Sequence, residues 1–140
     1  DTDTFLLTYG DGVADVDING LIRFHKKSGK IATLTGVRPP SRFGDIVMGA
    51  DKVLRFTEKP QASAGLINGG FFVLKKKIFD YLRQDDDCDF EKGALENLAS
   101  EGQLGAYEHK GSWECMDTSR ETEHLNNLWN THRAFWKVWK

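Results

Sequence analysis

The segment Phe5-Leu6-Leu7-Thr8-Tyr9-Gly10-Asp11-Gly12 runs from apolar residues into an aspartate flanked by glycines. This pattern predicts a buried strand that stops at Gly10, with no neighbouring side chains to crowd a ligand at Asp11. In open α/β sheets, ligands bind at the carboxyl ends of the strands. A carboxylate there can hold a hard cation such as Mg²⁺ against phosphate oxygens. Asp11 can equally cap a turn or a following helix, so other parts of the chain have to separate the two interpretations.

The composition favours one domain that acts on small molecules. The chain has 140 residues, 39% of them hydrophobic, and a net charge of −2, which gives no electrostatic footprint for nucleic acid or an anionic membrane. No apolar run approaches the roughly 20 residues of a membrane span, and the first residues carry no signal-peptide pattern. The only two cysteines, Cys88 and Cys115, are consistent with free thiols in a reducing compartment. A single disulfide between them is the alternative. We therefore expect a cytoplasmic protein.

A helix is expected soon after the first strand. Asp17 is a favourable N-cap, and Ser28-Gly29 is a stop signal. Lys30–Val37 is rich in β-branched residues and is expected to be a second strand, which gives a β-α-β unit with parallel strands. The apolar face of the helix comprises Ile18, Leu21, Ile22 and His25, at positions i, i+3, i+4 and i+7.

The segment Asp15-x-Asp17-x-Asn19-Gly20 also matches the first half of a calcium-binding loop. Lys26 stands at the twelfth position of that loop, where a bidentate glutamate is needed. The helix cap is therefore the better interpretation.

Residues suited to a sugar phosphate follow a third strand, expected over Val53–Thr57. Pro60 ends that strand, so Glu58 and Lys59 lie at its end. Lys59 offers a cation for phosphate and Glu58 accepts hydrogen bonds from sugar hydroxyls, whereas the competing interpretation is an exposed ion pair. Arg42, in a preceding loop, can either meet phosphate or be solvated.

A pair of glycines marks the segment Ile67–Leu74. Gly69 and Gly70 lead directly into an apolar strand, which predicts either a close approach of bare backbone to a ligand or a tight turn. The Asn68 amide can both donate to and accept from a hydroxyl.

The later elements are less distinctive. Short apolar periodicities predict helices over 78–82 and 90–98, the second ending at Gly102, and a strand over 104–109. Residues 134–140 form an apolar tail with two tryptophans, which we expect to pack on the domain or on another subunit.

A second aspartate ends the strand expected over Ser112–Met116. Asp117 precedes Thr118-x-x-Glu121, a capping box for a helix. Its place after a strand and before a helix mirrors that of Asp11, although it also suits a first-turn charge on the helix dipole. The expected apolar face of this helix comprises Leu125, Leu128, Trp129 and His132.

Taken together, five segments resemble the sugar-phosphate nucleotidyltransferases. The resemblance covers nearly the whole chain, in order, and implies an α/β fold of the Rossmann-like, nucleotide-diphospho-sugar transferase type, with a mixed, mostly parallel sheet flanked by helices. The segments are Leu7–Asp15, Arg42-Phe43-Gly44, Glu58-Lys59-Pro60, Ile67–Leu74 and Trp113-x-x-Met116-Asp117-Thr118.

The resemblance also implies roles for single residues. Asp11 and Asp117 would hold Mg²⁺, and Lys59 would contact the sugar phosphate, so these three are the catalytic candidates. The candidates for contact with the substrates are Gly10, Arg42, Glu58, Lys59, Asn68 and Gly69.

Within the family, the likeness is greatest to members that transfer a cytidylyl group from CTP to glucose 1-phosphate. They release pyrophosphate and make CDP-glucose for carbohydrate biosynthesis, as in the O antigen of lipopolysaccharide, and they are homo-oligomers. The family's Gly-x-Gly-Thr-Arg nucleotide loop has no match here. Residues 1–140 are therefore expected to be the C-terminal portion of one nucleotidyltransferase domain, with an incomplete fold and no activity when isolated.

Three other functions stay open. One is uridylyl or thymidylyl transfer, because the base pocket of the family lies largely outside the matching part. Another is a metal-dependent glycosyltransferase, whose Asp-x-Asp motif Asp15-Val16-Asp17 could imitate. The third is a non-catalytic module that binds a sugar phosphate.

Overall fold

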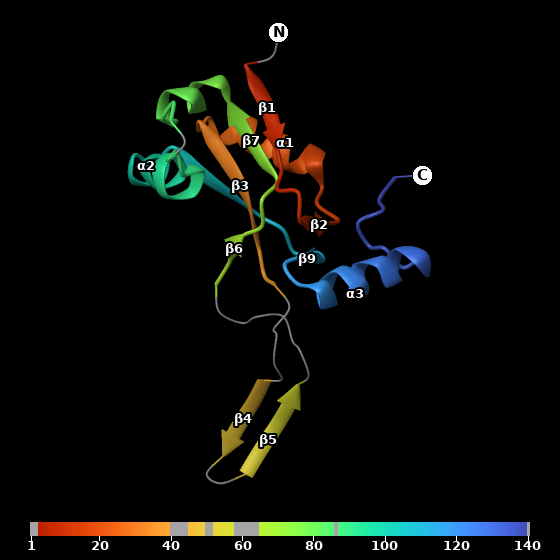
Figure 1. The fold of residues 1–140 in the computed structure, drawn as a ribbon. Helices are drawn as coiled ribbons and strands as arrows, with labels where there is room; N and C mark the ends of the chain where they lie inside the picture. The colour runs from red at the N-terminus through yellow and green to blue at the C-terminus, as the bar shows by residue number, and fades with distance from the viewer. Residues whose placement is uncertain (1–2, 40–44, 50–51, 58–64, 86, 140) are drawn as a thin grey trace.

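A five-stranded sheet forms the centre of the molecule. The computed structural model describes residues 3–39, 45–49, 52–57, 65–85 and 87–139. The sheet has the order β1-β7-β3-β6, and β8 pairs with the other edge of β3 (Figure 1). Its strands are β1 (Thr4–Leu7), β3 (Ala32–Val37), β6 (Ile67–Asn68), β7 (Phe72–Lys75) and β8 (Leu104–Glu108).

The expected mixed sheet is confirmed, but its pairing is not mostly parallel in the described strands. β3 pairs in parallel only with β8, and β7 pairs antiparallel with both β1 and β3. β1 and β3 therefore run in the same direction, as a β-α-β unit requires, with β7 inserted between them. Local sequence periodicity does not reveal such an insertion, because it reports which residues form a strand and not which strands become neighbours.

The helix α1 (Ile18–Ser28) forms as its sequence predicts. The Asp17 carboxylate accepts a hydrogen bond from the Gly20 N–H at 2.8 Å, and Gly29 ends the helix with a φ of 70°, a conformation that glycine adopts without strain. Leu21 and His25 are buried. Because α1 contacts β3, β7 and β8, it covers one face of the sheet.

The core lies on both faces of the sheet because successive side chains of a strand point to opposite sides. On β7, Phe72 and Leu74 pack beneath the 3₁₀ helix η1 (Lys76–Tyr81), the π-helix η2 (Phe90–Leu95) and α2 (Glu96–Ser100). Val73 packs against Leu21 of α1 on the other face. The helices predicted over 78–82 and 90–98 are therefore present, although part of them is of 3₁₀ and π type.

Two short antiparallel pairs lie outside the main sheet. β2 (Gly12–Ala14) pairs with β9 (Trp113–Cys115), and we call this pair the ribbon. β4 (Asp45–Gly49) and β5 (Lys52–Thr57) form a separate hairpin, drawn at the bottom of Figure 1. The first strand was expected to continue to Gly10, but β1 ends at Leu7 and the chain enters the ribbon at Gly12.

The last helix, α3 (Ser119–Asn130), begins at the predicted capping box. Of its expected apolar face, Leu125 is buried, Trp129 is 47% exposed, and His132 lies beyond the end of the helix with a φ of 59°. In the tail, Phe135 and Trp136 contact each other edge to face at 5.0 Å, whereas Val138 and Trp139 are exposed. Within the described residues, no helix combines the length and apolar character needed to cross a membrane.

Candidate active site

The ribbon brings the two predicted metal-binding aspartates to the same end of one element. Gly12 pairs with Cys115, and the Met116 N–H donates to the Asp11 carbonyl oxygen at 2.9 Å. Asp11 therefore lies opposite Met116, with Asp117 the next residue along the chain. Both aspartates are exposed. The sequence predicted each of them at a strand end, and the antiparallel pairing explains how two positions so distant in sequence become neighbours.

Asp117 is held between β9 and α3. Its carboxylate accepts from the Cys115 thiol at 3.3 Å, and its N–H donates to the Glu121 carboxylate at 3.0 Å. The Thr118 side chain accepts from the Glu121 N–H at 3.3 Å, which completes the capping box. Among the described residues, ligand atoms of Cys115, Asp117 and Glu121 lie within 4.8 Å of one another, and Asp11 is not in that group.

An open hollow of about 580 Å³ lies beside Asp11 and is lined by Tyr9, Gly10, Asp11 and Glu91. The Tyr9 hydroxyl donates to the Glu91 carboxylate at 2.5 Å and accepts from the Asn68 amide at 2.8 Å. Burial, followed by the hydrogen bond to Glu91, raises the pKa of Tyr9 to about 12, so the phenol stays protonated at neutral pH. The hollow thus presents two carboxylates and a phenol, and the Asn68 amide bonds to that phenol. Such groups suit a polyhydroxylated ligand.

The Asn68-Gly69-Gly70 segment is a tight turn that packs closely against its own protein. The side-chain Oδ1 of Asn68 accepts from the Gly70 N–H at 3.1 Å, and Gly70 has a φ of 75°. A Cβ on Gly69 would lie 2.5 Å from Val37, and one on Gly70 would lie 2.9 Å from Tyr9. Of the two interpretations of these glycines, the described contacts support the tight turn. A side chain at Gly69 would clash with Val37, and one at Gly70 would clash with Tyr9.

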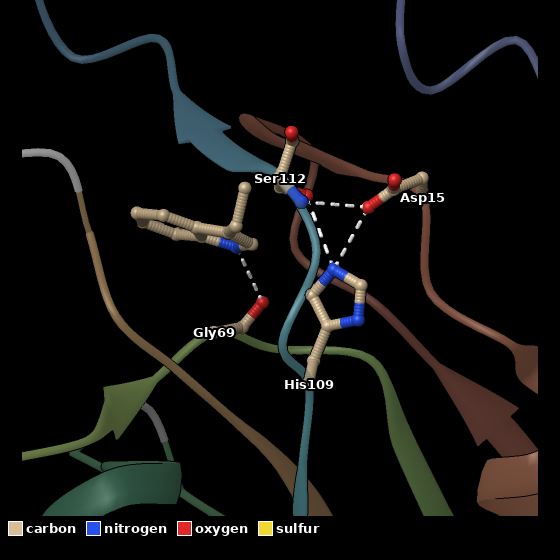
Figure 2. A network of polar contacts seen from close by, with 5 residues as sticks. Asp15, Gly69, His109 and Ser112 are labelled. Atoms are coloured by element: carbon tan, nitrogen blue, oxygen red, sulfur yellow. Dashed lines mark hydrogen bonds and ion pairs between the residues drawn. The ribbon is translucent and has the colours of Figure 1, made fainter. Parts of the chain in front are cut away.

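The ribbon is joined to this turn by Trp113. Its indole N–H donates to the Gly69 carbonyl oxygen at 2.9 Å, a bond that Figure 2 marks with a dashed line to Gly69. Trp113 and Asp117 are close in the chain, on and just after β9. The segment that carries one metal-site candidate is therefore fastened to the segment that carries Asn68.

The structure accounts for Asp15 and Asp17 without a metal. The Asp15 carboxylate accepts from the Ser112 N–H at 2.8 Å and lies 2.9 Å from His109. Asp17 caps α1 and contacts Arg23 at 3.3 Å. These contacts support the cap over the calcium loop, and they weaken the Asp-x-Asp interpretation.

The predicted site residues divide into three groups. Gly10 and Asp11 line the hollow, and Asn68 donates a hydrogen bond to Tyr9, which also lines it. These three predicted residues therefore lie together. Gly69 is buried in the turn, and Asp117 lies at the end of the ribbon. Arg42, Glu58 and Lys59 lie outside the described residues.

Four residues of the site were not singled out from the sequence. Tyr9 stands inside the first motif, and its place directly before Gly10 could have drawn attention to it. Glu91 is 82 positions from Tyr9, and His109 is 94 positions from Asp15, so no local pattern connects either pair. Trp113 belongs to the last motif, but its bond to Gly69 depends on the tertiary fold.

The donor chemistry of the two aspartates fits Mg²⁺. Mg²⁺ prefers carboxylate oxygens and usually takes one or two of them beside substrate phosphates. Asp11 and Asp117 supply two exposed carboxylates at the same end of the ribbon. Within the described part of the chain, no hydrogen-bond donor occupies the Asp11 carboxylate. Cys115 adds a thiol, a soft ligand that suits other metals better.

Relatives of known type match along most of the chain. The chain is 47% identical over all its 140 residues to a glucose-1-phosphate cytidylyltransferase of Salmonella typhimurium, of which it spans 54%. It is 33% identical over 132 residues to the catalytic subunit beta of a mannose-1-phosphate guanylyltransferase of Xenopus tropicalis, of which it spans 36%. The chain thus spans about half the length, or less, of these curated relatives.

Solved structures share the fold. A candidate glucose-1-phosphate thymidylyltransferase from Bacillus anthracis superposes with a TM-score of 0.63 at 19% identity, over 99% of this chain and 57% of that one. HddC from Yersinia pseudotuberculosis superposes with a TM-score of 0.61 at 21% identity, over 92% and 56%. The profile of the nucleotidyl transferase family matches residues 1–134. With the fold, the two strand-end aspartates and this match in agreement, the chain belongs to the nucleotidyl transferase family.

Proposed function

We propose that the protein to which this chain belongs transfers a cytidylyl group from CTP to glucose 1-phosphate and releases pyrophosphate. The observation that carries the proposal is the 47% identity, along the whole chain, to a glucose-1-phosphate cytidylyltransferase. The guanylyltransferase relative, at 33% identity, shares nucleotidyl transfer to a sugar 1-phosphate but uses another base by its name. The higher identity favours cytidylyl transfer over its alternatives.

The reaction needs positioned charges and no covalent nucleophile. A phosphate oxygen of the sugar 1-phosphate attacks the α-phosphorus of the nucleotide in line, and both reactants are anions that have to be held together. Asp11 and Asp117 would hold Mg²⁺, which when bound neutralises charge on phosphate oxygens. Lys59 and Arg42 would both hold the phosphate of the sugar 1-phosphate.

We place the hexose in the hollow beside Asp11. Tyr9, Asn68 and Glu91 already form one hydrogen-bonded group there, so a sugar hydroxyl would meet oriented partners rather than mobile ones. The protonated Tyr9 phenol can donate only one hydrogen bond, which in the described structure goes to Glu91. A hydroxyl that binds here would therefore donate to Glu91 or accept from the Asn68 amide.

The proposal is tested by assaying the whole protein for pyrophosphate release with glucose 1-phosphate, Mg²⁺ and, in turn, CTP, UTP and dTTP. We expect kcat/KM for CTP to exceed the others by at least about tenfold, which corresponds to about 1.4 kcal/mol of discrimination. A preference for UTP or dTTP would replace the base assignment and leave nucleotidyl transfer in place. Release of a nucleoside diphosphate from a nucleotide sugar would instead establish a glycosyltransferase, and sugar-phosphate binding without turnover a non-catalytic module.

A further inference from the structure

The end of the ribbon opposite the two aspartates is closed by a cluster of His109, Asp15 and Ser112 that the proposed reaction does not use. The His109 Nε2 lies 2.9 Å from the Asp15 carboxylate and 3.2 Å from the Ser112 carbonyl oxygen (Figure 2). Both partners are acceptors, so Nε2 carries the hydrogen. The same Asp15 oxygen also accepts from the Ser112 N–H at 2.8 Å.

These contacts extend a ladder that is otherwise very short. β2 and β9 pair at three positions, and a two-stranded antiparallel pair alone is marginally stable in water. Asp15 directly follows β2 and Ser112 directly precedes β9. The next backbone bond, from the Asp15 N–H to the Ser112 carbonyl oxygen, is long at 3.4 Å. The Asp15 side chain therefore supplies a shorter link across the ribbon than the backbone does.

His109 connects this cluster to the main sheet. The side chain of His109 is 8% exposed. The backbone N–H of His109 donates to the Gly36 carbonyl oxygen of β3 at 2.9 Å. The connecting loop leaves no room for a side chain at Gly111, because a Cβ there would collide with the Asp15 carboxylate and lie 2.7 Å from the His109 ring. The cluster is thus tightly packed and fixed to the sheet by a backbone bond.

We infer that His109, acting through Asp15 and Ser112, is a positioning residue that holds the ribbon in register and so sets Asp117 against Asp11. The assignment of metal binding to those two aspartates rests on the proposed function, but the structural role of the cluster does not. Asp11 is four residues from Asp15 and Asp117 is five from Ser112. Over such short spans a shift of the strands at one end reaches the other end directly.

Amide hydrogen exchange, followed by NMR in the 140-residue chain without metal, tests the inference. The Met116 N–H reports pairing beside Asp11. We expect His109→Leu to lower its protection at least about tenfold while amides of β3 and β7 keep theirs, and His109→Gln to retain most of it because the amide can still donate. Unchanged Met116 protection in His109→Leu, or an equal loss in β3 and β7, would overturn the inference.

Two further variants guard against a trivial explanation. Gly111→Ala should lower Met116 protection in the same way, because it crowds the cluster without removing a polar group, and it decides the question if His109→Leu does not fold. His124→Leu is the matched control, because it removes another contact between a histidine and a carboxylate of β9. That contact joins His124 to Glu114 at 3.2 Å, and the His124 side chain is 53% exposed. Equal loss of protection in His124→Leu would mean that any change on β9 loosens the ribbon, which contradicts a specific role for His109.

A Mn²⁺ titration followed by electron paramagnetic resonance separates this inference from the proposed function. We expect His109→Leu to weaken Mn²⁺ binding at least about fivefold, His124→Leu to leave it unchanged, and Asp117→Asn to abolish it. If the wild-type chain binds no Mn²⁺, or if Asp117→Asn does not weaken binding, the metal site of the proposed function fails, and the exchange experiment still decides the role of His109. Full Mn²⁺ affinity in His109→Leu would refute the positioning role at the metal site.

Discussion

At Asp117 the backbone and the side chain serve different neighbours. The N–H donates to Glu121 at the start of α3, whereas the carboxylate faces the Cys115 thiol. Replacement by asparagine keeps the backbone donor and most of the side-chain volume but removes the charge. The helix start and the proposed metal site can therefore be separated experimentally at this one residue.

We predict that Asp117→Asn lowers kcat/KM of the whole protein at least about tenfold, or about 1.4 kcal/mol, because the proposed metal ligand loses its charge. The midpoint of urea unfolding should stay near that of the wild type, since the contact from the backbone N–H to Glu121 is retained. Steady-state kinetics at several Mg²⁺ concentrations give the answer. An unchanged rate with normal Mg²⁺ dependence would exclude Asp117 as a ligand.

The His25 side chain is buried, and within the described residues its ring makes one hydrogen bond. Its Nδ1 lies 2.9 Å from the Thr33 hydroxyl, and among the described residues its Nε2 has no partner. Burial, followed by the positive charge of Lys75, lowers the pKa of His25 below its ordinary value of 6.5. The folded protein therefore binds a proton at His25 less readily than the unfolded chain does.

The sign of the resulting pH dependence follows from linkage. The stabilising effect of neutral His25 is complete above the unfolded pKa of 6.5 and is lost progressively as the pH falls from there towards the lower folded pKa. We predict that the free energy of unfolding, measured with urea, decreases between about pH 7.5 and about pH 5.5. The decrease should be smaller in His25→Gln and unchanged in the control His132→Gln, which alters an exposed histidine. An equal decrease in both variants would contradict the assignment to His25.

The sequence identified residues whose roles are local. The Asp17 cap, the stop at Gly29 and the Thr118-x-x-Glu121 capping box are all confirmed, because each depends on neighbours within four positions along the chain. The Tyr9–Asn68 and Tyr9–Glu91 bonds connect residues 59 and 82 positions apart. Such pairs result from the order of strands in the sheet, which one sequence does not encode in a readable pattern.

The same distinction holds for whole elements. α1, β3 and α3 lie where periodicity and capping place them. The insertion of β7 between β1 and β3 was not predicted, nor was β2, whose three residues are too few for an alternating pattern. The sequence showed that the two aspartates have similar surroundings, and the family resemblance implied their joint role, but the ribbon that joins them was not predicted.

The turn between β6 and β7 depends on a glycine that packs against β3. A Cβ on Gly69 would lie 2.5 Å and 2.7 Å from the two methyl groups of Val37, which is fully buried. Val37 cannot move away without disturbing the core, because protein interiors are closely packed.

We predict that Gly69→Ala lowers the free energy of unfolding by about 1–3 kcal/mol, as overpacking does in other cores. The comparison is with Gly10→Ala, where no atom lies within 4 Å of the added Cβ. Urea unfolding of both variants and of the double variant Gly69→Ala/Val37→Ala measures the effect. If removing the Val37 methyl groups does not recover part of the loss, the clash is not its cause.

For the whole molecule, the central question is how much of the reaction this chain can perform. It spans 54% of the cytidylyltransferase that it matches at 47% identity, and it carries the hollow beside Asp11. The prediction that residues 1–140 form the C-terminal portion of the domain stays a prediction, as does a subunit contact through residues 134–140.

We predict that the 140-residue chain binds glucose 1-phosphate without turning it over. Calorimetric titration should show binding that Lys59→Ala weakens at least about tenfold, because the phosphate would lose the cation proposed to hold it. Lys77→Ala, which changes an exposed lysine on η1, serves as the control. No binding by a folded chain would mean that the sugar site needs further residues or that the assignment of Lys59 is wrong.

The ribbon has a consequence for the order in which the molecule folds. Val13 pairs with Glu114, which lies 101 positions later in the chain. Closing a chain of that length costs about 4 kcal/mol of entropy, which three residue pairs do not offset. We therefore expect the ribbon to form after β3 and β8 have paired and shortened the effective loop. Asp11 and Asp117 are then expected to come together late in folding, so a partly folded chain should lack the arrangement proposed to hold Mg²⁺.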